Sequence, residues 1–267
     1  TLIMAFAANW PVAMAPGMGL NAFFAFTVVA AMGFSWQQAL GAVFISGVIF
    51  LVLTLTGVRK WLIDGIPQSL RSAIVVGIGM FLALIGLNSA GIVVGNPATM
   101  VGLGDLTAPG ALLAVLGLFI MAGLDALKIR GAILIGILAV TVIAMVFGLQ
   151  AFGGLVSMPP SIMPTLFQMD ILGALSFGFI QVILVFVLVE VFDATGTLIG
   201  VAKRAGLIEP GKPNNLGRAL LADSTAIIGG SMLGTSSTTA YIESASGVQA
   251  GGRTGLTALV VAVLFLL

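Results

Sequence analysis

Apolar runs long enough to cross a membrane follow one another along the chain, with short polar connections between them. A helix that spans a bilayer needs about 20 mainly apolar residues. The pattern predicts the tail of one helix at 1–9, an interrupted segment at 11–33, spans at 37–57, 72–94, 110–127, 131–152 and 172–200, a shorter run at 219–233, and a further span from 254. We therefore expect an all-α polytopic membrane protein.

A polar stretch, Gly234 to Gly252 (GTSSTTAYIESASGVQAGG), lies between two of these apolar runs and carries a single acid, Glu243. Polar, irregular backbone is tolerated at membrane depth only where it is buried in protein or lines a cavity. Residues 231–238 favour an extended path, and 238–247 are suited to begin a short helix. The stretch therefore predicts half of a substrate site in the middle of the membrane.

The segment near the start of the chain repeats this design. Pro11 and Pro16 prevent a continuous helix, and Gly17 and Gly19 free the backbone before a helix that we expect to begin near Leu20. The first turn of that helix presents unpaired N–H groups, which suit a ligand. Paired interrupted helices are typical of the central site of a transporter. The two extended pieces would satisfy each other by pairing as strands.

Composition excludes several classes of protein. Of the 267 residues, 60% are hydrophobic and 7% are charged, whereas a soluble globular domain has about 25% charged residues. The mean hydropathy is +1.23. The net charge of +1 gives no reason to expect a nucleic acid partner, and the absence of Cys and His excludes thiolate metal sites and His-based proton relays. We expect no enzyme active site and no cofactor.

The basic residues indicate the topology, because they alternate with non-basic connections in step with the spans. The connections at 33–36, 95–109 and 153–170 contain no Lys or Arg. The positive-inside rule then places the basic loops in the cytoplasm, here of a bacterial inner membrane, and makes 219–233 run outward and 234–252 inward. All the cations are expected in loops: Arg59, Lys60 and Arg71; Lys128 and Arg130; Lys203, Arg204, Lys212 and Arg218; and Arg253.

Three acids are expected inside the membrane, where a charge is rarely kept without a use. Glu190 and Asp193 are three residues apart and share one helix face, and Glu243 is the third. A structural hydrogen-bond network is the open alternative for Glu190 and Asp193. The remaining acids are expected at span ends or in loops: Asp64, Asp105, Asp125, Asp170, Glu209 and Asp223.

Three segments carry a family resemblance: APGMGLNAFFAF (15–26), FDATGTLIGVAKRAG (192–206) and GTSSTTAYIESASGVQAGGRTGL (234–256). They resemble the signature segments of the azaguanine-type purine permeases, the adenine/guanine/hypoxanthine branch of the nucleobase:cation symporter (nucleobase–ascorbate transporter) superfamily. The resemblance implies 14 transmembrane segments in two inverted seven-helix repeats, with a short strand and a half-helix in segments 3 and 10. This chain, 1–267, would be a fragment covering about segments 2 to 11. Core-type segments would be 1–57 and 172–267, and gate-type segments about 72–152.

The resemblance also implies the substrate and the site. Purine uptake would use Glu243 on segment 10, Glu190 on segment 8 beside Asp193 of the FD-x-TGT motif, and Asn21 on segment 3. Carboxylates accept the N–H groups of a purine edge. The backbone of the interrupted segments near Gly19, with the neighbouring hydroxyl groups of Ser237 and Thr238, would bind the remaining edge. Burial favours the neutral form of a carboxyl, so the three acids Glu190, Asp193 and Glu243 would couple uptake to protons, with sodium left open.

Other readings stay open. An anion transporter of the sulfate-permease type has a related fold but would favour positive charge in its site. A passive channel or a non-transporting membrane protein is the other alternative. The partners expected are a purine nucleobase and the lipid bilayer, with a homodimer left open.

Overall fold

The computed structural model describes residues 1–65, 67–129, 131–151, 153–154, 161–208 and 215–266. The chain divides into two compact units, Thr1–Val75 with Met158–Leu267, and Val76–Ser157. Three of the charged residues placed in loops from the sequence, Arg130, Glu209 and Lys212, lie outside the described residues, as do the side chains of Lys60, Asp64 and Arg71.

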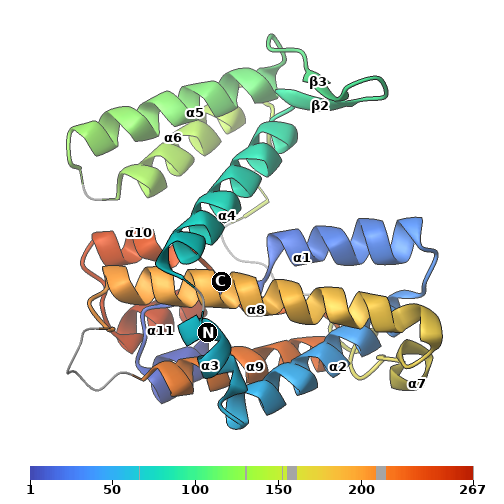
Figure 1. Ribbon diagram of the computed structural model, residues 1–267. Coiled ribbons are helices and arrows are strands. Elements are labelled where there is room, and N and C mark those ends of the chain that lie inside the picture. The colour runs from blue at the N-terminus through green and yellow to red at the C-terminus, as the bar shows by residue number, and fades with distance from the viewer. Residues whose placement is uncertain (66, 130, 152, 155–160, 209–214, 267) are drawn as a thin grey trace. The chain divides into compact units, whose positions relative to one another are not determined.

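The first unit is mostly helical (Figure 1). Its order is η1 (Met4–Ala8), β1 (Met14–Pro16), α1 (Met18–Ala22), η2 (Phe23–Ala31), α2 (Trp36–Leu55), α3 (Val58–Gly65), the start of α4 (Gln68–Ser89), α7 (Ile171–Ala174), η3 (Phe177–Phe179), α8 (Ile180–Arg204), α9 (Leu216–Leu233), β4 (Thr238–Ala240), α10 (Ser244–Gln249) and α11 (Gly255–Leu264). The second unit holds the rest of α4, β2 (Val93–Asn96), β3 (Met100–Leu103), α5 (Pro109–Ala126) and α6 (Ala132–Val146).

Helix α2 is the centre of the first unit and packs on both α8 and α9. It starts with a capping box, in which the Ser35 hydroxyl accepts from the Gln38 N–H and the Gln38 side chain accepts from the Ser35 N–H, both at 3.2 Å. A Cβ atom added at Gly47 would lie 2.8 Å from Ile227 of α9, so the small residue permits the close approach of the two helices. Trp10, Phe50, Phe179, Phe186 and Leu198 fill the core beside them.

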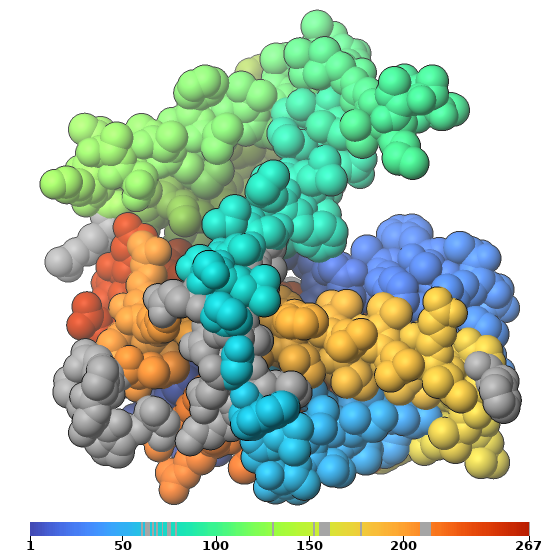
Figure 2. All heavy atoms as spheres, viewed as in Figure 1, coloured from blue at the N-terminus to red at the C-terminus, as the bar shows by residue number. Residues whose placement is uncertain are grey.

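Three of the five full spans predicted from the apolar runs correspond to helices that could cross a membrane by length and composition, whereas Gly79–Ser89 and Ala132–Val146 are shorter apolar helices. Among the described residues, Trp36–Leu55, Pro109–Ala126 and Ile180–Arg204 are long and apolar enough to cross a membrane. Ile180, Leu184 and Leu188 form an exposed apolar stripe on α8, the helix that is exposed along one face of its unit in Figure 2. Exposed apolar surface of this kind suits hydrocarbon rather than water.

The two interrupted segments meet as predicted. Strand β1 pairs with β4 in antiparallel register, with Met14 opposite Ala240 and Pro16 opposite Thr238. The chain enters β1 after Asn9, whose φ of 56° lies in the left-handed region, and after Pro11, which cannot continue a helix; Pro16 is the last residue of the strand. Each strand therefore satisfies backbone groups of the other inside a unit made of helices.

Three local expectations were wrong. Residues 231–238 are not all extended, because α9 continues to Leu233 and ends at Gly234 with a φ of 92°. The span at 172–200 is not continuous, since α7, η3 and α8 follow one another there. The connection at 95–109 contains part of a β2–β3 hairpin that the apolar pattern did not predict. Gly and Asn near the turn are the signals that were available for it.

Candidate substrate site

The β1–β4 pair is closed by further bonds to the residues around it. Gly17 donates its N–H to the Ser237 carbonyl (3.0 Å), and Tyr241 donates its N–H to the Ala13 carbonyl (2.9 Å). The Tyr241 hydroxyl donates to the Pro16 carbonyl at 2.6 Å. These bonds fix the start of α1 and the approach to α10 at opposite ends of one short ladder.

Strand β4 is tied to both acids of α8. The Ser237 hydroxyl donates to Glu190 Oε1 at 2.6 Å, and the Thr239 hydroxyl donates to Asp193 Oδ2 at 2.9 Å. Alternate residues of a strand point to the same face, and acids three residues apart share a helix face. The two spacings match, so one face of β4 lies on the acidic face of α8.

Glu190 has only part of its hydrogen-bonding capacity satisfied. It is 2% exposed. Ser46 of α2 donates to the Val43 carbonyl at 2.8 Å and lies 3.2 Å from Glu190 Oε1. Glu190 Oε2 is buried and has no hydrogen-bond partner among the described residues. A buried carboxylate oxygen without a partner is costly, so this atom is open to a donor from a ligand, a water molecule or a proton.

The Asn21 and Thr238 side chains beside this face lie in different directions. Asn21 of α1 accepts a hydrogen bond from Ser236, which ties α1 to the residues before β4. Thr238, which the sequence placed in the site, has its side chain against Gly230 of α9, where an added Cβ atom would collide with it. Its backbone pairs with Pro16, so any contact of Thr238 with a ligand on the α8 face is through the main chain.

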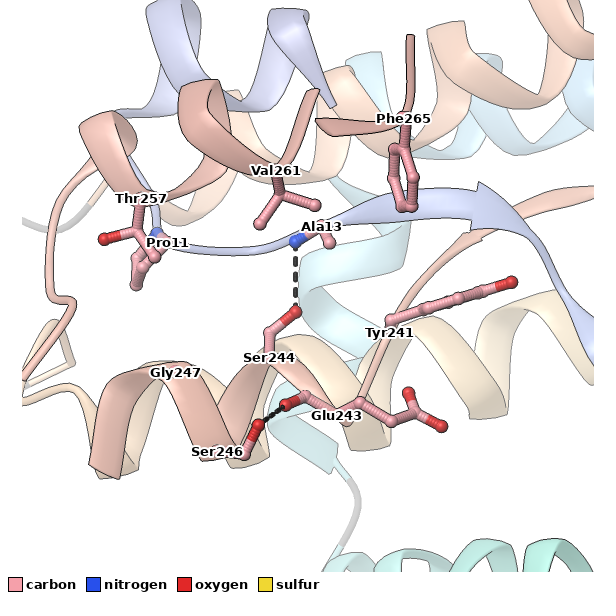
Figure 3. Close-up of a pocket in the computed structure, with 10 residues that line it drawn as sticks. All are labelled: Pro11, Ala13, Tyr241, Glu243, Ser244, Ser246, Gly247, Thr257, Val261 and Phe265. Carbon is pink, nitrogen blue, oxygen red and sulfur yellow. Dashed lines mark hydrogen bonds between the residues drawn. The ribbon is translucent and has the colours of Figure 1, made fainter. Parts of the chain in front are cut away.

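Glu243 lies outside the β4–α8 contacts. It directly precedes α10, is exposed, and its carboxylate receives no hydrogen bond from the described residues. It lines a cavity of about 290 Å³ between α10 and α11 (Figure 3). The carboxylate extends away from Val261 of α11 and from Phe265, which directly follows that helix, in that view.

The structure therefore brings most of the predicted site residues together, in two neighbouring groups. Glu190, Asp193 and Ser237 form one group, and Glu243 belongs to the other. Gly19 is half-buried on α1, one turn before the π-helical stretch η2. Whether these residues bind substrate stays a prediction.

Sequence reasoning missed three hydroxyl side chains of the site. Ser236 and Thr239 belong to the polar stretch. Each lies two residues from a residue that was named, Ser236 from Thr238 and Thr239 from Ser237, so the period of two along a strand is the signal for them. Ser46 stands alone in the apolar helix α2. A single serine in such a run has no distinguishing pattern, because serine also bonds to its own helix in membrane proteins.

Arg59 and Asp223 were placed wrongly in loops or at span ends. Both are fully buried, Arg59 in α3 and Asp223 in α9. Arg59 Nη2 lies 2.6 Å from Asp223 Oδ2. Each charge offsets the other, which permits both inside the protein. The sequence could not show the pair because 164 residues separate its members.

No group of three or more His, Cys, Asp or Glu side chains suited to a metal ion lies within the described part of the chain. The groups that line the candidate site are carboxylates, hydroxyls and main-chain groups.

Comparison with known proteins decides the family. The model of the Permease family (Xan_ur_permease) matches residues 1–267. The chain belongs to the Permease family. Relatives of this Permease family chain include the adenine permease AdeP of Escherichia coli (strain K12), 49% identical over 268 residues, covering 100% of the chain and 60% of the relative. The guanine/hypoxanthine permease PbuO of Bacillus subtilis (strain 168) is 49% identical over 271 residues, covering 99% and 63%. The resemblance to the purine branch is confirmed.

The fold of this Permease family chain is similar to a solved structure. The transmembrane domain of a cyanobacterial bicarbonate transporter, BicA, superposes with a TM-score of 0.64 at 17% identity, covering 99% of this chain and 71% of that one. The mostly helical membrane-transporter fold is confirmed at this level. The chain spans about three fifths of the length of the curated relatives it matches, 60% and 63% for the two above.

Proposed function

We propose that this chain carries the substrate site of a secondary transporter that takes up purine nucleobases: adenine, guanine or hypoxanthine. The observation that carries the proposal is the β1–β4 pair bound through Ser237 and Thr239 to Glu190 and Asp193. Relatives at 48–49% identity are named as adenine and guanine/hypoxanthine permeases. The chain holds no arrangement that we recognise as an enzyme active site within its described residues.

The donor and acceptor pattern of the site suits a purine. A purine edge presents N–H donors beside ring acceptors, and an ionised carboxylate is a pure acceptor. Glu190 Oε2 has free lone pairs, and the exposed carboxylate of Glu243 has all of its own. Hydroxyls and main-chain groups of β4 and α1 supply donors and acceptors for the remaining edge. In this proposal Asn21 orients the α1 side through its bond to Ser236.

Coupling follows from the same carboxylates. In the proposed cycle, a proton on Glu190, Asp193 or Glu243 reduces the negative charge at the site and accompanies the substrate. Sodium in place of the proton is the alternative, and uptake measured with and without a sodium gradient distinguishes them. A protonophore would abolish accumulation only in the proton-coupled case.

We also propose the finer architecture that the motifs imply. The 14 segments would form two inverted repeats, with the first unit as part of a core and the second as part of a gate. The basic loops would face the cytoplasm of a bacterial inner membrane, and two copies would form a homodimer. The opposite polarity of β1 and β4 supports the inverted arrangement, because they pair antiparallel.

An anion transporter is the main competing function, since the bicarbonate transporter shares the fold. The charges argue against it. Glu190 and Asp193 lie on one face of α8, and in their ionised forms both carboxylates would repel a bound anion. The cation Arg59 is already engaged with Asp223.

The test is the substitution Glu243→Gln in the full protein, with uptake of radiolabelled hypoxanthine or adenine normalised to protein in the membrane. The matched control is Asp125→Asn, an exposed carboxyl at the end of α5. We expect E243Q to lose purine uptake while remaining in the membrane and D125N to behave as wild type. Uptake by E243Q at the wild-type level would show that Glu243 is not part of the substrate site.

A further inference from the structure

Arg59 of α3 is a buried cation with contacts to α2 and α9, although its Nε and Asp223 Oδ1 have no hydrogen-bond partner among the described residues. Nη2 donates to Asp223 Oδ2 at 2.6 Å, and Nη1 donates to the Leu220 carbonyl at 3.0 Å. Nη1 also lies 3.4 Å from the hydroxyls of Thr54 and Ser224. The guanidinium is 3.8 Å from the centre of the Phe50 ring, a cation–π contact. One side chain thus joins the C-terminal part of α2, the start of α3 and the middle of α9 (Figure 1).

Stability alone does not account for such a pair. Burying two charges is costly, and a well-packed apolar replacement of both is often neutral or stabilising, whereas removal of one partner is strongly destabilising. An ion pair differs from apolar packing because its hydrogen bonds have direction: here Nη2 donates to Asp223 and Nη1 donates to the Leu220 carbonyl, both on α9. The Arg59–Asp223 pair therefore fixes the position of α9 along the axis of α2. Contacts between Leu, Ile and Val side chains define that position less sharply.

The position of α9 determines the position of β4. From Asp223 the helix runs about 15 Å to its last residue, Leu233. One turn before that end, Gly230 is packed against the side chain of Thr238, and the Thr235 N–H is bound to the Gly230 carbonyl at 3.0 Å.

We propose that Arg59 and Asp223 are a positioning pair for transport: by fixing α9 against α2, they hold β4 so that Ser237 and Thr239 meet the acids of α8. The pair does not touch substrate. The inference rests on the proposed function for its transport readout, but the placement of β4 is measurable without it.

The test uses the full protein with both charges replaced, Arg59→Met with Asp223→Leu, so that neither partner is left buried alone. Arg59→Lys is the conservative variant. We expect the double variant to reach the membrane and to unfold at a temperature similar to that of wild type. Its purine KM should rise, or its turnover fall, by about tenfold to 100-fold, as for a misplaced binding group. R59K should recover part of the loss.

Two further readouts separate positioning from general structure. In a double-mutant cycle with Ser237→Ala, the pair and Ser237 should be strongly non-additive, because both act through β4. Amide hydrogen exchange in 235–241 should accelerate at least tenfold in the double-charge variant, with α2 unchanged. Additive effects on uptake, or unchanged exchange in 235–241, would overturn the inference. If wild type takes up no purine, the proposed function fails, and the exchange experiment still decides the role of the pair.

Discussion

Two adjacent glycines of α9 allow a matched test of how closely this helix approaches β4. An added Cβ atom at Gly230 would collide with the Thr238 hydroxyl and lie 3.1 Å from Thr235 Cγ2. At Gly229 the same atom would meet nothing within 4 Å. Both sites are in the same helix, so Gly→Ala gains about 1 kcal/mol of helix propensity in each. The difference between the two variants therefore isolates the contact with β4.

The expected magnitude follows from the geometry. Carbon atoms pack at about 3.5–4.0 Å, so in Gly230→Ala the strand must withdraw from α9 by roughly 1 Å or Thr238 must leave its rotamer. Overpacking of this kind costs about 1–3 kcal/mol. Because Thr239 lies in β4 and Ser237 directly precedes it, a shift of about 1 Å also weakens their bonds to the α8 acids, and a misplacement of that size costs on the order of 100-fold in activity.

The assay is purine uptake per protein molecule, together with the thermal midpoint of the purified full protein. Gly230→Ala should lose about tenfold to 100-fold in uptake and unfold at a lower temperature. Gly229→Ala should transport as wild type and be as stable or more so. Equal behaviour of the two variants would refute the close α9–β4 contact as a determinant of the site.

Three further predictions concern the site and the topology. Thr239→Val keeps the shape of the side chain but removes the hydroxyl that donates to Asp193. A hydrogen bond to a charged group contributes about 1.5–3 kcal/mol, so we expect at least a tenfold loss of uptake. Thr239→Ser keeps the hydroxyl and should largely avoid this loss. Gly17→Ala places a Cβ atom 2.6 Å from Thr239 Cγ2 and should impair uptake similarly; uptake at the wild-type level would contradict the packing. This chain has no Cys, so Ala98→Cys and Leu127→Cys, on opposite sides in the proposed topology, should label from outside and inside respectively; labelling of both from one side would exclude it.

The sequence alone was sufficient for the parts of the fold that follow from hydropathy and backbone chemistry. The apolar run at 37–57 corresponds to α2, and the segment that contains Pro11 and Pro16 forms β1 rather than a helix. The pairing of β1 with β4, the strand of the second interrupted segment, could be predicted because unpaired backbone groups inside a membrane protein have few other partners. The three signature segments predicted the family, which the Permease family match bears out.

The residues that sequence reasoning misplaced are those whose role depends on a distant partner. The sequence around Asp223 is that of an interfacial acid, and only the structure shows that Asp223 is paired with Arg59. Likewise, nothing in the sequence around Ser46 indicates that its hydroxyl lies 3.2 Å from Glu190. The end of α9 was misjudged although local signals for it were present: Met232 and Leu233 favour a helix, and Gly234 ends α9 in the left-handed conformation.

The most direct test of the account is accumulation by the wild-type full protein in proteoliposomes with an imposed inward proton gradient. Radiolabelled hypoxanthine should accumulate above its external concentration, unlabelled adenine or guanine should compete, and bicarbonate and sulfate should not. Failure to accumulate any of the three purines, or accumulation of bicarbonate by the same protein, would contradict the proposal that the β1–β4 and α8 carboxylate site serves a purine transporter.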